Sequence, residues 1–374
     1  MPSKSLFTYA FLLIYIAFTI IIFFIYVPSA LDGHSKIELF ADSETFEEIA
    51  LGESNYEFSS IYEAIGVKFN FVGPLIVLYI FQMNRVAILF FNLTLFLLGL
   101  YFLNKSRCFN MLKLVVLLGI NPIVFSSLLS VNKEIFVYLS LCLLVRYFYR
   151  PTIILAILII SLSVLARWQF TICIIMIMMM YSKYNPLKRY PLLSIFISIL
   201  VISVFYHRIK IFSEVNMFIE LLLNNSSDSI FGRMSMFQLN SDIGYLTVVI
   251  PKAIHLMFGI IKNYNEFLHW QEFYNDVLTY LFGISMVCVF IYLILSKKFP
   301  LGVNNGIDLS WIIYIVIFSI SPIYTPRYFV AVYILWAIKL SLTKYGLLKL
   351  IDTYKCGHEC IFYTKKGVKF GYVR

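Results

Sequence analysis

Residues Leu6 to Val27 form an apolar run that contains no charged side chain. The hydrocarbon layer of a bilayer requires roughly 20 such residues in a helix, so this run is long enough to cross it. Similar runs recur along the chain, and 61% of all residues are hydrophobic while only 13% are charged. Soluble domains carry about 25% charged residues. The sequence therefore predicts an all-α fold, a polytopic integral membrane helix bundle.

About ten transmembrane helices are expected, and residues 1–374 are interpreted as one integral membrane domain. The expected spans are residues 6–27, 86–103, 114–129, 135–148, 152–166, 170–181, 190–206, 277–296, 309–321 and 328–340. The apolar piece at 71–83 ends at Asn84-Arg85. We expect this piece to be interfacial or re-entrant, with a full crossing as the alternative.

The distribution of charge predicts the orientation of the spans. Segment 104–113 contains Lys105, Arg107 and Lys113 and no acidic residue, which is typical of a cytoplasmic segment. Both termini are then cytoplasmic, and the tail at 342–374 forms a basic cytoplasmic extension. An acidic loop at 28–70 and a large loop at 207–276 lie on the outer side, where we expect amphipathic or re-entrant helices.

The outer loop after the first span holds nine acidic residues between Asp32 and Glu63, opposed by only two lysines up to Lys68. Asp42 is the first catalytic candidate, followed by Glu44. A carboxylate partly removed from water at a membrane surface can act as a general base. Two neighbouring carboxylates could instead coordinate a divalent cation. A solvated acidic loop that only sets the topology is the plainer interpretation.

The second group of candidates follows a predicted break at Asn121-Pro122, where irregular backbone could line a cavity. Lys133 and Glu134 come directly after that span and bind substrate in this interpretation. The alternative is an internal ion pair at a tight turn.

The triplet Arg167-Trp168-Gln169 lies at the outer mouth of two short spans. A guanidinium group beside an aromatic wall suits a phosphate or a sugar. Trp168 could equally be an interfacial anchor, with Arg167 extending its charged head to the membrane surface.

Three further residues are candidates for holding a diphosphate or a sugar. Arg233 and His255 belong to a mixed set of basic and aromatic residues in the large outer loop, and Arg327 opens the last span after two prolines. A single histidine in such a loop is more often structural. No P-loop, GxSxG or HExxH pattern occurs in the sequence, which argues against nucleotide-driven chemistry.

Taken together, these features resemble bacterial polysaccharide polymerases of the Wzy type and, more loosely, the polytopic glycosyltransferases of the C superfamily. The resemblance rests on the acidic outer loop with Asp42, the hairpin from Asn121-Pro122 to Asn132-Lys133-Glu134, Arg167-Trp168-Gln169, the long outer loop and Arg327-Tyr328. It implies a multi-pass enzyme of the bacterial inner membrane. This enzyme would join undecaprenyl-diphosphate-linked repeat units into O-antigen, as in lipopolysaccharide, or capsule at the periplasmic face.

The resemblance also implies roles for individual residues. Asp42 or a nearby acid would deprotonate the acceptor hydroxyl, and Arg167, Arg233 and Arg327 would hold the leaving diphosphate. No cofactor is expected, with a divalent cation as the alternative, because several acids suit a metal-using transferase. The expected partners are the lipid-linked glycan and the bilayer, together with a chain-length regulator and a flippase of the same pathway, and no nucleic acid.

Two other functions remain open at this stage. One is a C-superfamily glycosyltransferase that uses a lipid-phosphate sugar, and the other is a flippase or transporter for lipid-linked glycans. Transporters often show internal repeats and charged residues at mid-membrane depth. The charges here cluster at the predicted outer span ends and loops, which favours chemistry at the surface.

Overall fold

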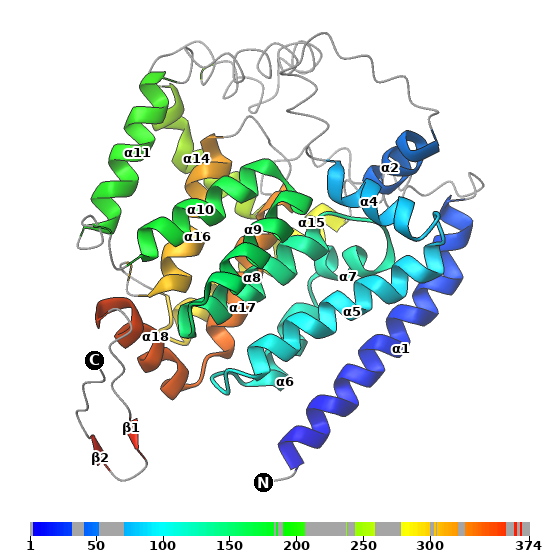
Figure 1. The fold of residues 1–374 in the computed structure, drawn as a ribbon, viewed down its shortest axis with the longest axis horizontal. Coiled ribbons are helices and arrows are strands. Elements are labelled where there is room, and N and C mark those ends of the chain that lie inside the picture. The colour runs from blue at the N-terminus through cyan, green and yellow to red at the C-terminus, as the bar shows by residue number, and fades with distance from the viewer. Residues whose placement is uncertain are drawn as a thin grey trace.

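The computed structural model describes residues 3–31, 41–51, 71–182, 185, 190–205, 237, 244–258, 278–299, 303, 305–320, 326–356, 363–364 and 367–368. The regular elements of this part are helices, apart from one hairpin of two short strands, β1 (Tyr363–Thr364) and β2 (Gly367–Val368). The predicted all-α class and the helical bundle are therefore confirmed for the described residues, and Figure 1 shows the arrangement.

Two helices meet the length and composition of a membrane span, α1 (Ser3–Leu31) through its residues Leu6–Val27 and α5 (Arg85–Asn104). The helices α6 (Met111–Gly119) and α7 (Pro122–Leu129) form a third if they are counted as one span, although they are bent by 79°. The predicted span over 114–129 thus consists of two helices that meet at Asn121-Pro122, because Pro122 cannot continue the helical hydrogen bonding. Ten crossings remain a prediction.

The remaining helices are shorter. They are α2 (Ala41–Leu51), α4 (Val72–Ile80), α8 (Glu134–Tyr149), α9 (Ile153–Ala166), α10 (Trp168–Tyr181), α11 (Pro191–Phe205), α14 (Gly244–Phe258), α15 (Thr279–Leu295), α16 (Gly306–Ile320), η6 (Pro326–Phe329), α17 (Val330–Ser341) and α18 (Lys344–Cys356). Several of them match a predicted span closely, among them α8, α9, α10 and α15.

Helices α8 and α17 form the centre of the bundle. All twelve residues of α17 are buried, and α8 is buried over most of its length. Helix α8 packs against α5, α9 and α17, while α17 also packs against α6, α15 and α16. A helix that is apolar on every side requires neighbours on every side, and these two have them.

The outer helices expose large apolar side chains. Leu13 and Ile14 on α1 and Ile153 and Ile154 on α9 are each at least 68% exposed. An apolar surface of this extent marks a region that contacts lipid or another protein. It supports the predicted placement of the bundle in a membrane.

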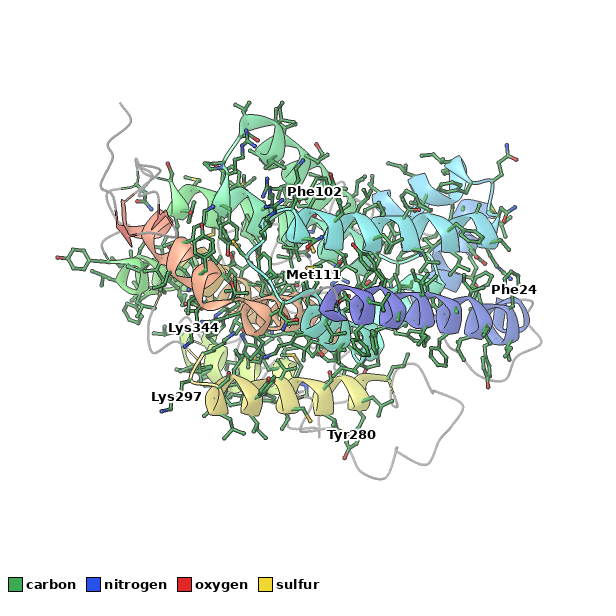
Figure 2. All side chains as sticks on the ribbon, turned by 90° about the horizontal axis from the view of Figure 1, so that it is seen from below. Phe24, Phe102, Met111, Tyr280, Lys297 and Lys344 are labelled. Carbon is green, nitrogen blue, oxygen red and sulfur yellow. The ribbon has the colours of Figure 1, made fainter. Side chains whose placement is uncertain are left out.

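The ends of the helices gather into two groups. At one end, which we call the α18 end, Asn110 N donates to Ser341 O at 2.8 Å and Thr343 N donates to Cys108 O at 2.9 Å. At the other, the α2 end, Ser43 Oγ donates to Val131 O at 2.9 Å. Figure 1 shows α2 and α4 far from α18, and Figure 2 shows Lys297 and Lys344 on one side of the bundle and Phe24 on the other.

This grouping agrees with the predicted alternation of the spans. The segments expected to be cytoplasmic, such as 104–113 and the start of 342–374, meet at the α18 end. The segments expected outside, such as α2 and the turn before α8, meet at the α2 end. We therefore use the α2 end as the predicted periplasmic end.

Helix α4 has nine residues, which corresponds to a length of about 14 Å at 1.5 Å per residue. It lies against α2 and α9 at the α2 end, and the chain then turns through Gln82 and Met83, both with positive φ, into α5. A helix of this length is too short to cross a bilayer, which agrees with the prediction of an interfacial or re-entrant piece at 71–83.

Helix α14 is the main described element of the predicted large loop, apart from Phe237. It contains Pro251 and packs against α11, α15, α16 and η6, so it belongs to the packed bundle. The acidic loop is described at 28–31 and in α2, which buries Phe46 and exposes Glu48.

Gly73 tests the contact between α4 and α9. A Cβ at this position would lie 2.0 Å from the backbone oxygen of Leu165, and backbone atoms cannot move aside as a side chain can. We expect Gly73→Ala to destabilise the protein by about 1–3 kcal/mol, as overpacking does, measured by thermal unfolding in detergent. The control is Gly119→Ala, whose Cβ would meet only the ring of Tyr15, at 3.1 Å. Equal unfolding temperatures for both variants would contradict the close contact.

Candidate functional site

The bend between α6 and α7 directs the chain into the candidate site. Asn121 Oδ1 caps α7 by accepting from Ile123 N and Val124 N, both at 3.0 Å, and Asn121 Nδ2 donates to Ser285 Oγ at 3.2 Å. Asn and Pro at these two positions are a strong signal for the start of a helix. The break that the sequence predicted at Asn121-Pro122 is confirmed.

The turn from α7 to α8 is buried and fixed by side-chain amides. Asn92 Nδ2 donates to Ser130 O at 2.8 Å, and Asn132 Oδ1 accepts a hydrogen bond from Glu134 N at 3.3 Å. These bonds satisfy backbone groups that would otherwise be left without partners in an apolar interior. They also place Glu134 in the first turn of α8, with its side chain inside the bundle.

Arg167 occupies the turn between α9 and α10. Its backbone is extended, with φ −166° and ψ 144°, and it separates the two helices while staying bonded to both. Arg167 N donates to Ser163 O at 2.9 Å, and Thr171 Oγ1 donates to Arg167 O at 3.1 Å. Only 3% of the residue is exposed, so its side chain enters the bundle and does not extend to the membrane surface.

Glu134 and Arg167 form a buried ion pair. Arg167 Nη2 lies 2.5 Å from Glu134 Oε1, and both side chains are at most 4% exposed. Two atoms of the pair, Glu134 Oε2 and Arg167 Nε, have no hydrogen-bond partner among the described residues. Charges are expensive to bury, and the cost is recovered only when their remaining polar atoms are also satisfied. The pair therefore has spare capacity for a polar ligand.

An aromatic ring covers the guanidinium group. The Cζ of Arg167 lies 3.6 Å from the ring centroid of Tyr328, which belongs to η6. Tyr314 Oη donates to Tyr328 O at 2.6 Å and so ties η6 to α16. Arg327 lies on the same segment, half-buried, with its Cζ 5.5 Å from the Tyr328 ring. Stacking of this kind orients the guanidinium plane.

The two residues after Arg167 extend the unsatisfied polar surface. Trp168 Nε1 and Gln169 Oε1 are buried atoms that find no hydrogen-bond partner within the described segments. One is a donor and the other an acceptor. Together with Glu134 Oε2 and Arg167 Nε they make four such atoms on two neighbouring turns, although such groups usually find partners in folded proteins.

Lys133 faces the side of the turn where α2 lies. Its Nζ is 5.1 Å from the ring centroid of Phe46 and 5.2 Å from that of Phe71, and the residue is 5% exposed. Helix α2 is also held by the bidentate pair of Arg85 with Glu47, at 2.9 and 3.2 Å. Lys133 therefore connects the acidic segment to the turn that carries Glu134.

Four other predicted site residues remain, and the structure describes the side chain of one of them, His255. Asp42 and Glu44 lie in the first turns of α2, next to Ser43, whose hydroxyl contacts Val131; their side chains are outside the described part. Arg233 lies outside the described residues. His255 is buried on α14, which packs against η6.

The structure therefore brings Glu134 and Arg167 together, and Arg327 lies beside the Tyr328 ring that covers Arg167. Trp168 and Gln169 follow Arg167 directly in the chain. Tyr328 and Tyr314 were not predicted as site residues from the sequence. The position of Tyr328 next to Arg327 was the one signal for it. Tyr314 lies within an apolar run, where nothing in the sequence indicates its partner.

A second buried pair was also missed, at the α18 end. Lys339 Nζ contacts Asp308 Oδ1, and Asn305 Nδ2 donates to Asp308 Oδ2 at 2.7 Å. The sequence did carry a signal for this pair. Asp308 begins one predicted span and Lys339 ends the next, so an antiparallel hairpin brings them to the same level.

No protein-family model matches the chain, and the searches of curated proteins and of solved structures found no significant match. The function is therefore inferred from the geometry of the site.

The pairing of Glu134 with Arg167 can be tested through stability. Removing one partner of a buried pair leaves an uncompensated charge and costs about 3–5 kcal/mol. We expect Glu134→Gln and Arg167→Gln each to lower the unfolding temperature strongly in detergent. The double variant buries no charge and should unfold above either single variant. A double variant whose loss equals the sum of the two single losses would show that the residues act independently.

Proposed function

We propose that the protein polymerises undecaprenyl-diphosphate-linked oligosaccharide repeat units into surface polysaccharide at the predicted periplasmic end. The observation that carries this proposal is the buried Glu134–Arg167 pair with its unsatisfied polar atoms. Unsatisfied buried groups at a chain turn are costly to folding and are typical of sites where a ligand completes the bonding.

The reaction requires a base and a partner for the leaving diphosphate. A hydroxyl oxygen of the acceptor sugar attacks the anomeric carbon of the donor, and its proton passes to a carboxylate. The bond from that carbon to the diphosphate oxygen breaks, and its electron pair leaves with the diphosphate. Positioning and neutralisation of the developing charge supply most of the catalysis, so the reaction needs no cofactor.

Arg167 and Glu134 suit these two roles as a coupled pair. While the site is empty, the two charges neutralise one another. A substrate diphosphate competes with Glu134 for the guanidinium group, which binds phosphate oxygens through two parallel bonds. Glu134 is then released from its cationic partner, and its carboxylate can accept the proton of the acceptor hydroxyl.

The neighbouring residues would hold the rest of the substrate. The Tyr328 ring keeps the Arg167 guanidinium oriented, and Arg327, which also lies near this ring, would bind further phosphate charge. Trp168 Nε1 and Gln169 Oε1 offer one donor and one acceptor for sugar hydroxyls. Asp42 and Glu44, on the helix held over this turn by Ser43 and Phe46, remain the alternative base or the ligands of a divalent cation.

Polysaccharide length in cells tests the proposal. A strain without the gene would be complemented with wild type, Glu134→Gln, Arg167→Gln or Asp42→Asn, with protein levels checked. Loss of a general base typically lowers a rate by about 100- to 10,000-fold. We expect single repeat units on the lipid anchor, with long chains lost, in the deletion strain and in the first two variants. Asp42→Asn reports whether the base lies on α2 instead.

The matched control is Arg150→Gln, an exposed arginine at the α18 end that is far from the site in the fold. It should leave the chain lengths unchanged. Loss of even the single repeat unit in the deletion strain would point to an earlier transferase or a flippase. Normal long chains in both Glu134→Gln and Arg167→Gln, at normal protein levels, would refute the assigned site.

A further inference from the structure

Three lysines lie close together at the last turn of α17, at the α18 end of the bundle. Lys113 comes from α6, Lys298 follows α15 and Lys339 belongs to α17. Figure 2 views this region from below and labels the nearby Met111, Lys297 and Lys344. Asp308 is the acidic residue that pairs with Lys339, and Asn305 holds its second oxygen. Positive charge is therefore in excess here.

Lys113 and Tyr292 form a contact between α6 and α15. Lys113 Nζ donates to Tyr292 Oη at 2.7 Å and lies 4.2 Å from the centroid of the Tyr292 ring. Asn121, which follows α6 in the chain, donates to Ser285 of α15, so α6 and α15 run antiparallel. Tyr292 is 42% exposed, and the hydrogen bond to Lys113 is open to the surroundings.

Lys298 is held beside this contact. Its Nζ donates to Leu340 O at 2.7 Å and to Leu342 O at 2.8 Å, at the carbonyl end of α17. Burial, together with the positive charges of Lys113 and Lys339, lowers the pKa of Lys298 to about 8. The lysines are therefore close enough to repel one another.

Neither Lys113 nor Lys298 forms an ion pair with a carboxylate in the part of the chain that the structure describes. Carbonyl and hydroxyl oxygens accept their hydrogen bonds but bring no full negative charge. A bound anion would remove the repulsion between the lysines and keep these bonds. An ammonium group donates up to three hydrogen bonds, so Lys113 retains capacity for two more and Lys298 for one more.

The surroundings indicate which anion the site suits. Ile291, Ile294 and Leu295, next to Tyr292 on α15, are large apolar residues that are 49%, 49% and 74% exposed. Tyrosine and lysine beside an exposed apolar surface are typical of the headgroup level of a membrane. The cytoplasmic leaflet, predicted to lie at this end, carries anionic phospholipids.

We infer that Lys113, Tyr292 and Lys298 form a binding site for an anionic phosphate group, supplied by a phospholipid headgroup or by a free phosphate ester. The ammonium groups of Lys113 and Lys298 bind phosphate oxygens. The hydroxyl of Tyr292 accepts a hydrogen bond from Lys113 and holds the Lys113 side chain in place. The exposed apolar surface of α15 accommodates the acyl chains when the source is a lipid. This site is at the opposite end from Glu134 and Arg167, and it depends on the membrane placement but not on the proposed reaction.

Lipid titration of the purified full-length protein in detergent tests the inference. Native mass spectrometry would count bound phosphatidylglycerol, phosphatidylcholine and glycerol 3-phosphate on wild type, Lys113→Gln and Lys298→Gln. Hydrogen bonds to charged groups contribute enough free energy that each substitution should weaken phosphatidylglycerol binding roughly tenfold. Lys297→Gln is the matched control, because Lys297 is exposed and adjacent and takes no part in the cluster.

The possible outcomes separate the two sources of the phosphate. Selective binding of phosphatidylglycerol, weakened in Lys113→Gln and Lys298→Gln but kept in Lys297→Gln, supports a lipid site. Equally tight binding of glycerol 3-phosphate, with the same dependence on the lysines, supports a free phosphate ester. Equal binding of phosphatidylglycerol and phosphatidylcholine, or an equal loss of binding in Lys297→Gln, overturns the inference. Lys113→Gln keeps the test valid if loss of the Lys298 bonds unfolds the protein, because Lys113 makes no bond to the end of α17.

Discussion

The ion pair between Glu134 and Arg167 is the interaction on which the α2 end depends. It joins the first turn of α8 to the turn between α9 and α10, 33 residues further along the chain. Because a lone charge in this environment would be far more costly than the pair, the two turns must meet for the bundle to form. Tyr328 then brings η6 against the guanidinium group. The ion pair and the stack together position four helices, α8, α9, α10 and η6.

The second pair, Asp308 with Lys339, plays the corresponding role at the α18 end, but its bonding is different. Asn305 satisfies the second carboxylate oxygen of Asp308 through its amide, and it caps α16 through its own oxygen. The α2-end pair leaves Glu134 Oε2 and Arg167 Nε without partners in the described residues. A buried ion pair that serves stability alone should have all its polar atoms hydrogen-bonded. The Glu134–Arg167 pair does not, so it is the better candidate for binding a ligand.

Much of the helical arrangement could be predicted because apolar runs and charge asymmetry are local features of a sequence. The break at Asn121-Pro122 and the exposed position of the 104–113 turn follow from such local signals. The partners of Glu134 could not be predicted in this way. The sequence suggested Lys133 as the ion-pair partner, and only the packing of α8 against α9 brings Arg167 to Glu134. The stack of Arg167 on Tyr328 depends on a contact between distant segments, which no local pattern reports.

The unsatisfied atoms of the Glu134–Arg167 pair link the fold to the proposed chemistry. In an active site, the bonds that hold the guanidinium group in the empty state must be ones that the substrate can replace. Glu134 uses one carboxylate oxygen on Arg167, so an incoming diphosphate, with more acceptor atoms and more charge, can displace it. The ring of Tyr328 keeps the guanidinium in place during that exchange, because stacking does not occupy its N–H groups. The same contact that stabilises the empty bundle is therefore the contact that the substrate would exchange.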